Sequence, residues 1–461
     1  MINSNFEWIN NETPCFHVNP LNLTVLNKPV DFYNNLKLNI SKSKKRIVLS
    51  SLYLGTGHLE QQLVDSIDKS LTENELNKVK ILLDHNRGQR GTSSSKTLLL
   101  PLISKYEDRF DLYLYHTPKL RGLIKKIASE RTNETIGIQH MKIYITDNDL
   151  IISGANLSHD YFDNRQDRYI LIKDCEKLCD FFESLIDSVS SHSFKVDKSG
   201  SLTYSKQIHP IEDRKDEFAT SLGADINNLL NKYKNMSLND EAQLNNEENK
   251  LLIYPLIQMS DALIRTDEYV TNKFFQSVIE GSKIYLAVGY FNLTNEYMNT
   301  IVKESQAKFN LLLSSPEANG FFGAQGFSKY IPNIYSYLEE DFLKFCTENK
   351  QQDRISLFEY KRPNWTFHAK GLWYYTDNKI NSLPTATIIG SSNFGHRSVQ
   401  RDLEANLLIF TKNPHVQNQL NQERKNLFDN TIKVDFNLFL SEVRVVPFWL
   451  KMFTKSFRSF F

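Results

Sequence analysis

The chain contains an internal repeat, in which the same order of apolar strands and polar residues occurs twice. Residues 46–53 (RIVLSSLY) match residues 283–290 (KIYLAVGY) at an offset of 237 residues. In both copies a helix-like stretch and a second apolar strand follow. Repetition on this scale predicts two lobes of equal plan, related by a pseudo-two-fold axis. Because strands alternate with helices in each copy, we expect an α/β fold with mixed or parallel sheets.

The later part of each copy carries polar residues in a fixed order. A His-x-Lys triplet comes first, and a short apolar strand then ends in a small-residue turn with an Asn. An acidic residue follows eleven positions after that Asn. In the first half these residues are His140, Lys142, Asn156 and Asp167, and in the second half they are His368, Lys370, Asn393 and Glu404. The histidines are offset by 228 rather than 237, which indicates an insertion near residues 377–383, where a loop tolerates it.

Length and composition limit the class of protein. The 461 residues exceed the ~100–200 expected of one domain. With 40% apolar and 24% charged residues the chain is typical of a soluble globular protein. Its 55 Lys and Arg against 54 Asp and Glu give a net charge of +1, so nothing in the total charge favours a nucleic-acid partner. The four cysteines do not form a disulfide framework, and we expect reduced structural thiols.

The sequence divides into four segments. We expect a first lobe over residues 10–212 and a second lobe over residues 251–440. Between them, residues 213–250 are rich in Asn, Glu, Asp and Lys, which predicts a charged, solvated connector. Residues 441–461 form the fourth segment. No run of 18 apolar residues predicts a membrane-spanning helix, and the N-terminus shows neither a secretory signal nor an Arg-rich presequence.

The C-terminal segment combines large aromatic residues with cations at helical spacing. The aromatic residues are Trp449, Phe453 and Phe457, and the cations are Lys451, Lys455 and Arg458. A basic, aromatic amphipathic helix is typical of a segment that lies in a membrane interface. A helix docked on the protein's own core gives the same pattern, so both interpretations stay open.

The duplicated polar residues suit chemistry at a phosphodiester. Residues two apart in an extended strand point to the same side, so each His projects together with its Lys. A phosphoryl transition state spreads negative charge over its equatorial oxygens, which the lysines and the Asn amides can hold. One His can attack phosphorus while the other handles protons. Asp167 and Glu404 would each accept a hydrogen bond from an imidazole.

A zinc site formed by His140 and His368 is the competing interpretation. The adjacent lysines argue against it, because they would repel a divalent cation. We therefore expect no metal and no cofactor.

At this level of detail the sequence resembles the phospholipase D superfamily. HMKIYITD is similar to its H-x-K-x4-D motif, with His140, Lys142 and Asp147, and HAKGLWYYTD resembles a second copy. The chain is most similar to the eukaryotic mitochondrial phosphatidylglycerophosphate synthases, from about residue 10 into the C-terminal tail. The segments that carry this likeness are 115–123, 133–144, 153–169, 315–323, 367–373 and 389–407.

The chain departs from the superfamily pattern at two places. The G-S-x-N turn is Ser153-Gly-Ala-Asn156 in the first half, and Tyr375 stands where the second motif would have its Asp. The residues expected to act directly on phosphorus are nevertheless present twice.

The resemblance implies a duplicated phospholipase D-like fold and a specific reaction. The family transfers the phosphatidyl group of CDP-diacylglycerol to sn-glycerol 3-phosphate, giving phosphatidylglycerophosphate and CMP. A two-step route through a phosphohistidine is implied, with His140 as nucleophile and His368 as base, although the sequence leaves the reverse assignment open. The resemblance also implies a peripheral protein of the inner mitochondrial membrane, with an anionic membrane surface as partner and no nucleic acid.

The acceptor of this reaction carries two negative charges, so its site needs fixed cations. Arginine suits bidentate capture of a phosphate. The candidates are Arg87, Arg90, Arg165, Arg168, Arg397 and Arg401. For Arg168 and Arg401, which lie close to Asp167 and Glu404 in sequence, a structural ion pair is the alternative.

Three other functions remain open on sequence alone. One is a phosphatidyltransferase or phospholipase of the same superfamily that uses serine, phosphatidylglycerol or water as acceptor. Another is a nuclease-type phosphodiesterase, against which the neutral total charge counts. The third is a non-catalytic lipid-binding protein, suggested by Tyr375.

Overall fold

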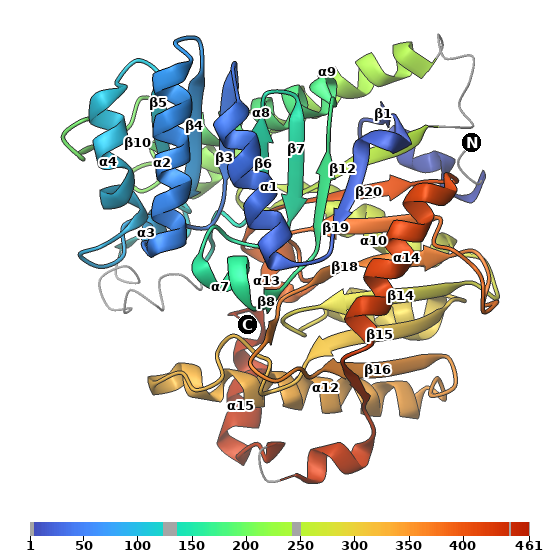
Figure 1. Ribbon diagram of the computed structural model, residues 1–461. Coiled ribbons are helices and arrows are strands. Elements are labelled where there is room, and N and C mark those ends of the chain that lie inside the picture. Colours follow the sequence, from blue (N-terminus) through green and yellow to red (C-terminus); the bar gives the residue numbers. More distant parts are fainter. Residues whose placement is uncertain (1–3, 123–135, 242–249, 442–443, 461) are drawn as a thin grey trace.

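The computed structural model describes residues 4–122, 136–241, 250–441 and 444–460. Two large mixed β-sheets form the frame of the molecule, and helices cover their faces (Figure 1). Across the first sheet the strands are β11 (Leu202–Thr203), β10 (Phe194–Val196), β5 (Phe110–Tyr115), β4 (Lys78–Asp84), β3 (Arg46–Ser50), β6 (Ile143–Thr146), β7 (Asp149–Ser153), β9 (Tyr169–Ile172) and β2 (Leu23–Leu26).

The second sheet has the same central order. Its strands are β1 (Phe16–Val18), β12 (Leu251–Met259), β20 (Leu403–Phe410), β19 (Ala386–Gly390), β18 (Lys370–Tyr375), β14 (Lys283–Val288), β15 (Lys308–Ser314), β16 (Ile355–Tyr360) and β21 (Thr431–Lys433), with β13 (Ile264–Arg265) beside β12. In each sheet three parallel strands adjoin an antiparallel one: β5, β4 and β3 with β6, and β16, β15 and β14 with β18. The predicted duplicated α/β fold is therefore confirmed.

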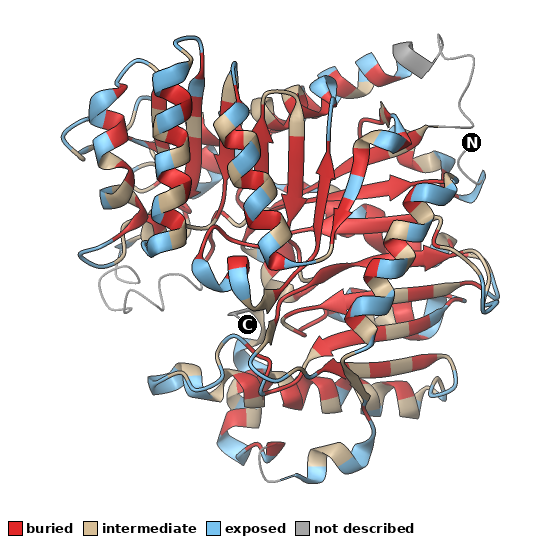
Figure 2. Cartoon of the chain, in the orientation of Figure 1, coloured by how far each residue is buried: buried red, intermediate tan, exposed pale blue. Residues whose placement is uncertain are grey.

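Three apolar clusters hold these layers together. The strands alternate in side-chain direction, so Ile47 and Leu49 face α1, α2 and α4, while Val48 faces the centre of the molecule. The central cluster joins both sheets with α8, α9 and α14, and the third packs the far face of the second sheet on α10 and α12. Figure 2 shows the resulting pattern, with buried strands and helices whose outer sides are exposed.

The helices are amphipathic and mostly short. Their bounds are α1 (Pro29–Lys42), α2 (His58–Glu73), α3 (His85–Gly88), α4 (Ser95–Lys105), α7 (His159–Asp163), α8 (Glu176–Ser191), α9 (Lys215–Glu241), α10 (Thr266–Ser277), α11 (Asn295–Asn299), α12 (Ile331–Glu348), α13 (His396–Gln400), α14 (Pro414–Phe428) and α15 (Phe448–Phe457). Shorter turns are η1 (Ser4–Asn11), η2 (Pro20–Asn22), η4 (Ser260–Ala262), η5 (Thr300–Glu304), η6 (Gly326–Tyr330), η7 (Phe436–Leu440) and η9 (Arg458–Phe460). Within the described ranges, no helix combines the length and the apolar character needed to cross a bilayer.

Two segments lie differently from the sequence expectation. Residues 215–241 form α9 rather than a solvated connector, because Phe218, Leu222 and Ile226 recur at helical spacing and are buried in the central cluster. The remainder of the predicted connector, residues 242–249, lies outside the described residues. The N-terminal segment belongs to the second lobe, since β1 pairs with β12 and the ring of Phe6 stacks on Phe274.

Candidate active site

Each His-x-Lys segment is held by the backbone of the opposite lobe. The carbonyl of Leu403 accepts a hydrogen bond from the amide of His140 at 2.9 Å. The amide of Leu403 in turn donates to the carbonyl of Ile138 at 2.9 Å. In the same way, the amide of His368 donates to the carbonyl of Gln166 at 2.8 Å, where β17 (Thr366–Phe367) pairs in parallel with β8 (Arg165–Gln166). The residue after Leu403 is Glu404 and the residue after Gln166 is Asp167. Each lobe therefore places its acidic residue next to the histidine of the other lobe.

This exchange produces one histidine–carboxylate pair on each side of the site. Nδ1 of His140 lies 3.0 and 2.9 Å from the two carboxylate oxygens of Glu404, to which it donates. Nδ1 of His368 donates to Oδ2 of Asp167 at 2.7 Å. Both hydrogen bonds that the sequence predicted are thus made, each between the lobes. They leave the Nε2 atoms as the nitrogens that can act on a substrate.

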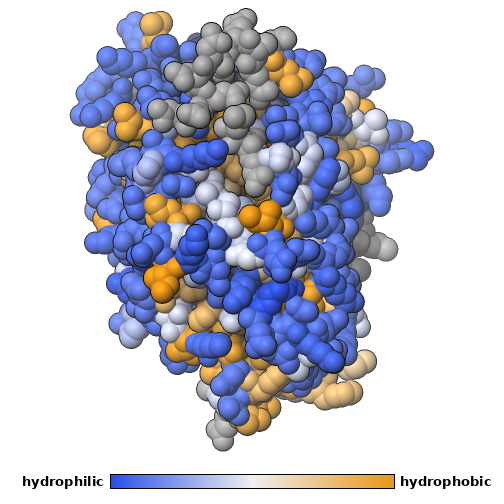
Figure 3. Space-filling model, turned by 90° about the vertical axis from the view of Figure 1, so that its right-hand side faces the viewer, coloured by the Kyte–Doolittle hydropathy of each residue, from blue (hydrophilic) through white to orange (hydrophobic). Residues whose placement is uncertain are grey.

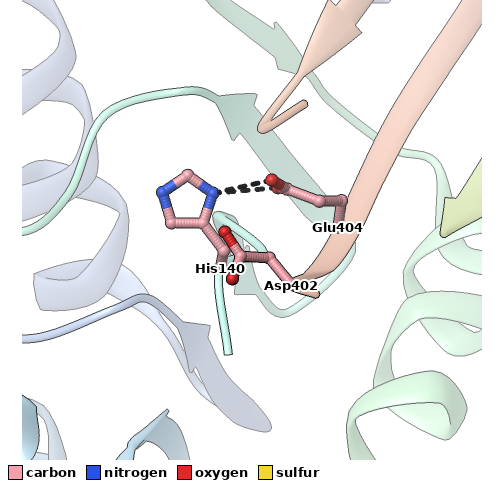
Figure 4. A group of neighbouring side chains, drawn as sticks. All are labelled: His140, Asp402 and Glu404. Atoms are coloured by element: carbon pink, nitrogen blue, oxygen red, sulfur yellow. Dashed lines mark hydrogen bonds and ion pairs between the residues drawn. The ribbon is translucent and has the colours of Figure 1, made fainter. Parts of the chain in front are cut away.

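The surroundings of the two imidazoles differ. Figure 4 shows the second ring nitrogen of His140 on the side away from Glu404, and among the described residues no hydrogen bond to it is made. Nε2 of His368 lies 3.3 Å from the hydroxyl of Tyr161, and the rings of Tyr161 and Tyr290 stand edge-on to this imidazole. Tyr161 has a place in the site that the sequence analysis missed.

The two lysines lie inside the same buried site. Nζ of Lys142 donates to the carbonyl of His140 at 2.7 Å, and Nζ of Lys370 donates to that of His368 at 2.9 Å. Burial lowers the pKa of Lys142 well below its usual value and lowers that of Lys370 to about 8. Burial also raises the pKa of Asp167 to about 6. Asp167 and Lys370 are therefore both charged only over a narrow range of pH around neutrality.

The same burial keeps both imidazoles neutral. It lowers the pKa of His140 and of His368 well below the usual value, and the neighbouring lysine adds to the effect in each case. The charge on His140 is itself among the causes that lower the pKa of His368, so the two rings share one electrostatic environment. A neutral imidazole has the free lone pair that nucleophilic or base catalysis requires.

The Asn turns lie at the ends of β7 and β19. Asn156 is 3% exposed, and within the part of the chain that the structure describes its Oδ1 has no hydrogen-bond partner. Oδ1 of Asn393 accepts from the amide of Tyr290 at 3.2 Å. The departure at Gly154 has a steric reason, because a Cβ there would lie 2.7 Å from Oδ1 of Asp167.

Asp147 does not belong to this site, contrary to its assignment as a catalytic residue. It lies at the end of β6 opposite to Lys142, where its Oδ1 accepts from the amides of Lys45 and Arg46 at 2.7 and 3.2 Å. Tyr375 holds the equivalent place in the second lobe, at the far end of β18. The motif aspartate closes a turn, and its absence from the second half leaves the site intact.

The predicted arginines divide into two groups. Arg165 lies beside His368: its guanidinium is 4.7 Å from the ring centre of Tyr161 and forms an ion pair with Asp160 at 3.0 Å. Arg87 lies 4.2 Å from the ring centre of Tyr53, and Arg90 follows α3 in a half-buried loop. A substrate-binding role for these three arginines stays a prediction.

The other predicted arginines have structural contacts. Arg168 is fully buried and forms a bidentate ion pair with Glu423 at 3.0 and 2.9 Å, which joins the lobes. Arg401 donates to the carbonyl and hydroxyl of Ser459 at 2.6 and 3.0 Å, which anchors the C-terminal tail. Their assignment to substrate binding is not supported by these contacts, and the structural alternative accounts for them. Arg397 pairs with Asp402 at 2.9 Å.

Asp402 is a second residue that the sequence analysis missed. Possible metal-ligand atoms of His140, Asp402 and Glu404 all lie within 4.8 Å of one another. Figure 4 shows the three side chains together. The spacing is compatible with a metal ion, but the charges nearby are not. Lys142, Lys370 and Arg397 all act on His140 as positive neighbours, and Glu404 is already engaged by the imidazole. We interpret Asp402 and Glu404 as two carboxylates beside His140 whose negative charge is balanced by these lysines and Arg397.

The C-terminal helix docks on the protein with one face and exposes the other. Leu450 and Thr454 are buried, and the carbonyl of Arg458 accepts from Asn292 at 2.7 Å while its guanidinium donates to the Asn292 side chain at 3.0 Å. Arg458 is thus used in docking and is not part of an exposed basic face. The opposite face of α15 exposes Trp449 and its neighbours, with Lys455 at the surface.

An apolar surface extends beyond this helix. Trp449 contacts Tyr330 of η6 at 5.3 Å between ring centres, and Phe453 contacts Phe327 at 5.1 Å. We name the exposed residues here the tail surface: Phe322, Phe327, Leu440, Val445, Phe448, Trp449, Met452 and Phe457. Figure 3 shows apolar residues gathered at the lower end of the molecule, where the C-terminal segment lies.

Comparison with known proteins agrees with the observed fold. No protein-family model matches the chain. The crystal structure of phosphatidylserine synthase from Haemophilus influenzae is similar in fold, with a TM-score of 0.71 at 18% identity over 97% of this chain and 95% of that one.

Relatives of the full chain are more informative. The human mitochondrial CDP-diacylglycerol–glycerol-3-phosphate 3-phosphatidyltransferase is 41% identical over 99% of this chain and 86% of its own length. A probable enzyme of the same name from Dictyostelium discoideum is 40% identical over 95% of this chain and 78% of its own length. The corresponding protein of Saccharomyces pastorianus is 35% identical over 93% of this chain and 85% of its own length. On this similarity the chain belongs to the family of CDP-diacylglycerol–glycerol-3-phosphate 3-phosphatidyltransferases.

Proposed function

We propose that the protein transfers the phosphatidyl group of CDP-diacylglycerol to sn-glycerol 3-phosphate and releases CMP. The observation that carries this proposal is the pair of buried His–carboxylate contacts made across the lobes, each with a lysine beside it. Two neutral imidazoles in one cationic site can act in turn on a single phosphorus atom. Membership of the family supplies the identity of donor and acceptor.

The first step forms a covalent intermediate on His140. Nε2 of His140 attacks the phosphorus that bears diacylglycerol, the bond to the CMP oxygen breaks, and CMP leaves with the bonding electrons. The ring becomes a cation because Nδ1 keeps its proton, and Glu404 accepts a hydrogen bond from that proton. Lys142, Lys370 and the side-chain amide of Asn156 hold the phosphoryl oxygens.

The second step passes the phosphatidyl group to the acceptor. A hydroxyl of glycerol 3-phosphate attacks phosphorus, the bond from Nε2 of His140 to phosphorus breaks, and the proton moves to Nε2 of His368. Asp167 stabilises the imidazolium that forms. Besides Lys370, Arg165 is a positive neighbour of this ring and is the first candidate to bind the acceptor phosphate, with Arg87 as a second candidate.

We further infer that the tail surface touches the bilayer that supplies the lipid substrate. Exposed aromatic and aliphatic side chains from three segments form it, and Lys329, Lys451 and Lys455 lie on the same segments. Aromatic residues with cations fit the interface of an anionic membrane. Because relatives bear the name mitochondrial, we place the enzyme peripherally on the inner mitochondrial membrane.

The test is an acceptor panel. Purified protein is mixed with labelled CDP-diacylglycerol in mixed micelles, and CMP and lipid products are followed separately with glycerol 3-phosphate, serine, phosphatidylglycerol or water. We expect phosphatidylglycerophosphate as the main product and its loss in His140→Ala and His368→Ala. Efficient transfer to serine or phosphatidylglycerol, or hydrolysis at the same rate without acceptor, would refute the proposal.

A further inference from the structure

Each of the two short helices beside the site begins an ion pair between an acidic residue and an arginine. The order of acid and arginine along the chain is reversed between the two pairs. The repeat offset of 237 places α7 opposite α13. In the first lobe Asp160 precedes its partner Arg165 by five residues, and their charged atoms lie 3.0 Å apart. In the second lobe Arg397 precedes Asp402 by five residues, at 2.9 Å. The acid of one pair therefore stands where the other has its arginine.

This reversal changes which charge faces the site. The side chain of Arg165 is 13% exposed and that of Asp160 is 55% exposed, so the cation is the inner member of the first pair. Asp402 is 3% exposed and Arg397 is 27% exposed, so the acid is the inner member of the second pair. Two lobes of equal plan thus present unlike charges to the cleft between them.

Each inner charge lies next to one of the two imidazoles. Arg165 is one of the positive neighbours of His368, and it also lies against Tyr161, whose hydroxyl contacts Nε2 of that ring. A carboxylate oxygen of Asp402 lies within 4.8 Å of His140 and of Glu404. In addition to the lysines near both rings, the His368 side thus holds an arginine and the His140 side a second carboxylate, so an anion is favoured more on the His368 side than on the His140 side.

We propose that the reversed ion pairs polarise the active site, so that Asp402 stabilises the positive charge on phosphorylated His140 while Arg165 draws a phosphate-bearing acceptor to the His368 side. The proposal rests on the proposed function and deepens it. Asp402 acts through His140 and is a positioning residue, whereas Arg165 touches the acceptor. The reversed order of charges gives the two histidines different surroundings and therefore different tasks. Two ion pairs of the same order would give both histidines the same surroundings.

The sharpest test inverts each pair without removing it. One variant carries Asp160→Arg with Arg165→Asp, and the other carries Arg397→Asp with Asp402→Arg. If a pair only stabilises the local fold, exchanging its acid and its arginine should be tolerated, because the salt bridge is kept. The control inverts the exposed pair of Asp68 and Lys105, which lie 2.7 Å apart on α2 and α4, away from the site.

Two readouts separate the sides. CMP released in a single turnover without acceptor reports the first step, and the ratio of kcat/KM for glycerol 3-phosphate over uncharged glycerol reports the second. We expect inversion in the first lobe to lower this ratio at least about tenfold, and inversion in the second lobe to slow CMP release at least about tenfold, since a charge some 5 Å away in a buried site is worth more than 1.4 kcal/mol.

The result that overturns the inference is retention of both readouts within the range of the control. If an inverted variant fails to fold by circular dichroism, Arg165→Gln and Asp402→Asn replace it, and the same split between the readouts is required of them. Failure of the proposed function is distinguishable, because wild-type protein would then show no CMP release from CDP-diacylglycerol at all.

Discussion

Nδ1 of His140 donates a hydrogen bond to Glu404 at 2.9 Å, and the two residues come from different halves of the duplicated chain. The reciprocal contact joins His368 of the second half to Asp167 of the first. Neither lobe therefore holds a complete site. The halves depend on each other, because each supplies the carboxylate that fixes the tautomer of the other half's imidazole.

Removing the charge of Glu404 should affect the chemical step and not substrate binding. In Glu404→Gln an amide can present either end to Nδ1, so the imidazole loses both its fixed tautomer and the partner that stabilises its cation. We expect kcat to fall about 10²–10⁴-fold with KM changed little. Steady-state kinetics check this. A Glu404→Gln enzyme with near wild-type kcat would show that the contact only supports the fold.

The pH dependence of activity should be bell-shaped. Asp167 must be ionised, and burial raises its pKa to about 6, so activity should fall as pH drops through about 6. Lys370 must be charged to hold phosphoryl oxygens, and burial lowers its pKa to about 8, so activity should fall as pH rises through about 8. Plots of kcat/KM against pH measure both limbs.

The alkaline limb can be assigned by one variant. Arginine keeps its charge throughout the accessible range, so Lys370→Arg should move or remove that limb, at whatever residual activity the longer side chain allows. An unchanged alkaline limb in Lys370→Arg would assign it to another group.

The ion pair of Arg168 and Glu423 should matter for stability and not for the acceptor. Both residues are buried, and Arg168→Ala leaves the carboxylate without its bidentate partner. We expect the free energy of unfolding to fall by about 3–5 kcal/mol. The double variant Arg168→Met with Glu423→Gln should recover part of this loss, since Gln still accepts from the indole of Trp373. Urea unfolding measures both, and a raised KM for glycerol 3-phosphate in a stable Arg168 variant would contradict the structural role.

The tail surface should control binding to vesicles. Removing the whole C-terminal segment would also break the contacts of Arg401 and Arg458, so point variants are the better test. We expect Trp449→Ser and Phe457→Ser each to weaken binding to anionic vesicles about tenfold, since burying one large apolar side chain is worth about 1.5–3 kcal/mol. Leu21→Ser is the control, because Leu21 is a large apolar side chain that is also exposed, on η2 and outside the tail surface. Equal binding by all three would remove the membrane role.

The repeat in the sequence predicted the fold well, because apolar periodicity and strand order are local signals. It also identified the four residues His140, His368, Asp167 and Glu404. It did not indicate which acid meets which histidine, since that pairing depends on how the backbone of 138–140 and 366–368 crosses between lobes. The spacing of residues in a sequence does not indicate contacts between segments that are so far apart along the chain.

Other differences have identifiable causes. The motif aspartate at position 147 looked catalytic, but a strand of alternating side chains separates it from the lysine of the same motif. Polar composition concealed the buried face of α9, whose apolar residues occupy one stripe only. The reversed charges of Asp160 and Arg397 were visible at the repeat offset, and comparing charges between the copies would have revealed them.

The central claim is that His140 carries the lipid phosphate between donor and acceptor. The most direct test mixes protein with labelled CDP-diacylglycerol without acceptor, denatures it at alkaline pH and locates the modified residue by mass spectrometry. We predict a phosphatidyl adduct on His140, which disappears on adding glycerol 3-phosphate in wild type and accumulates in His368→Ala. Modification at His368 instead, or CMP release that strictly requires the acceptor with no adduct in either protein, would contradict the account.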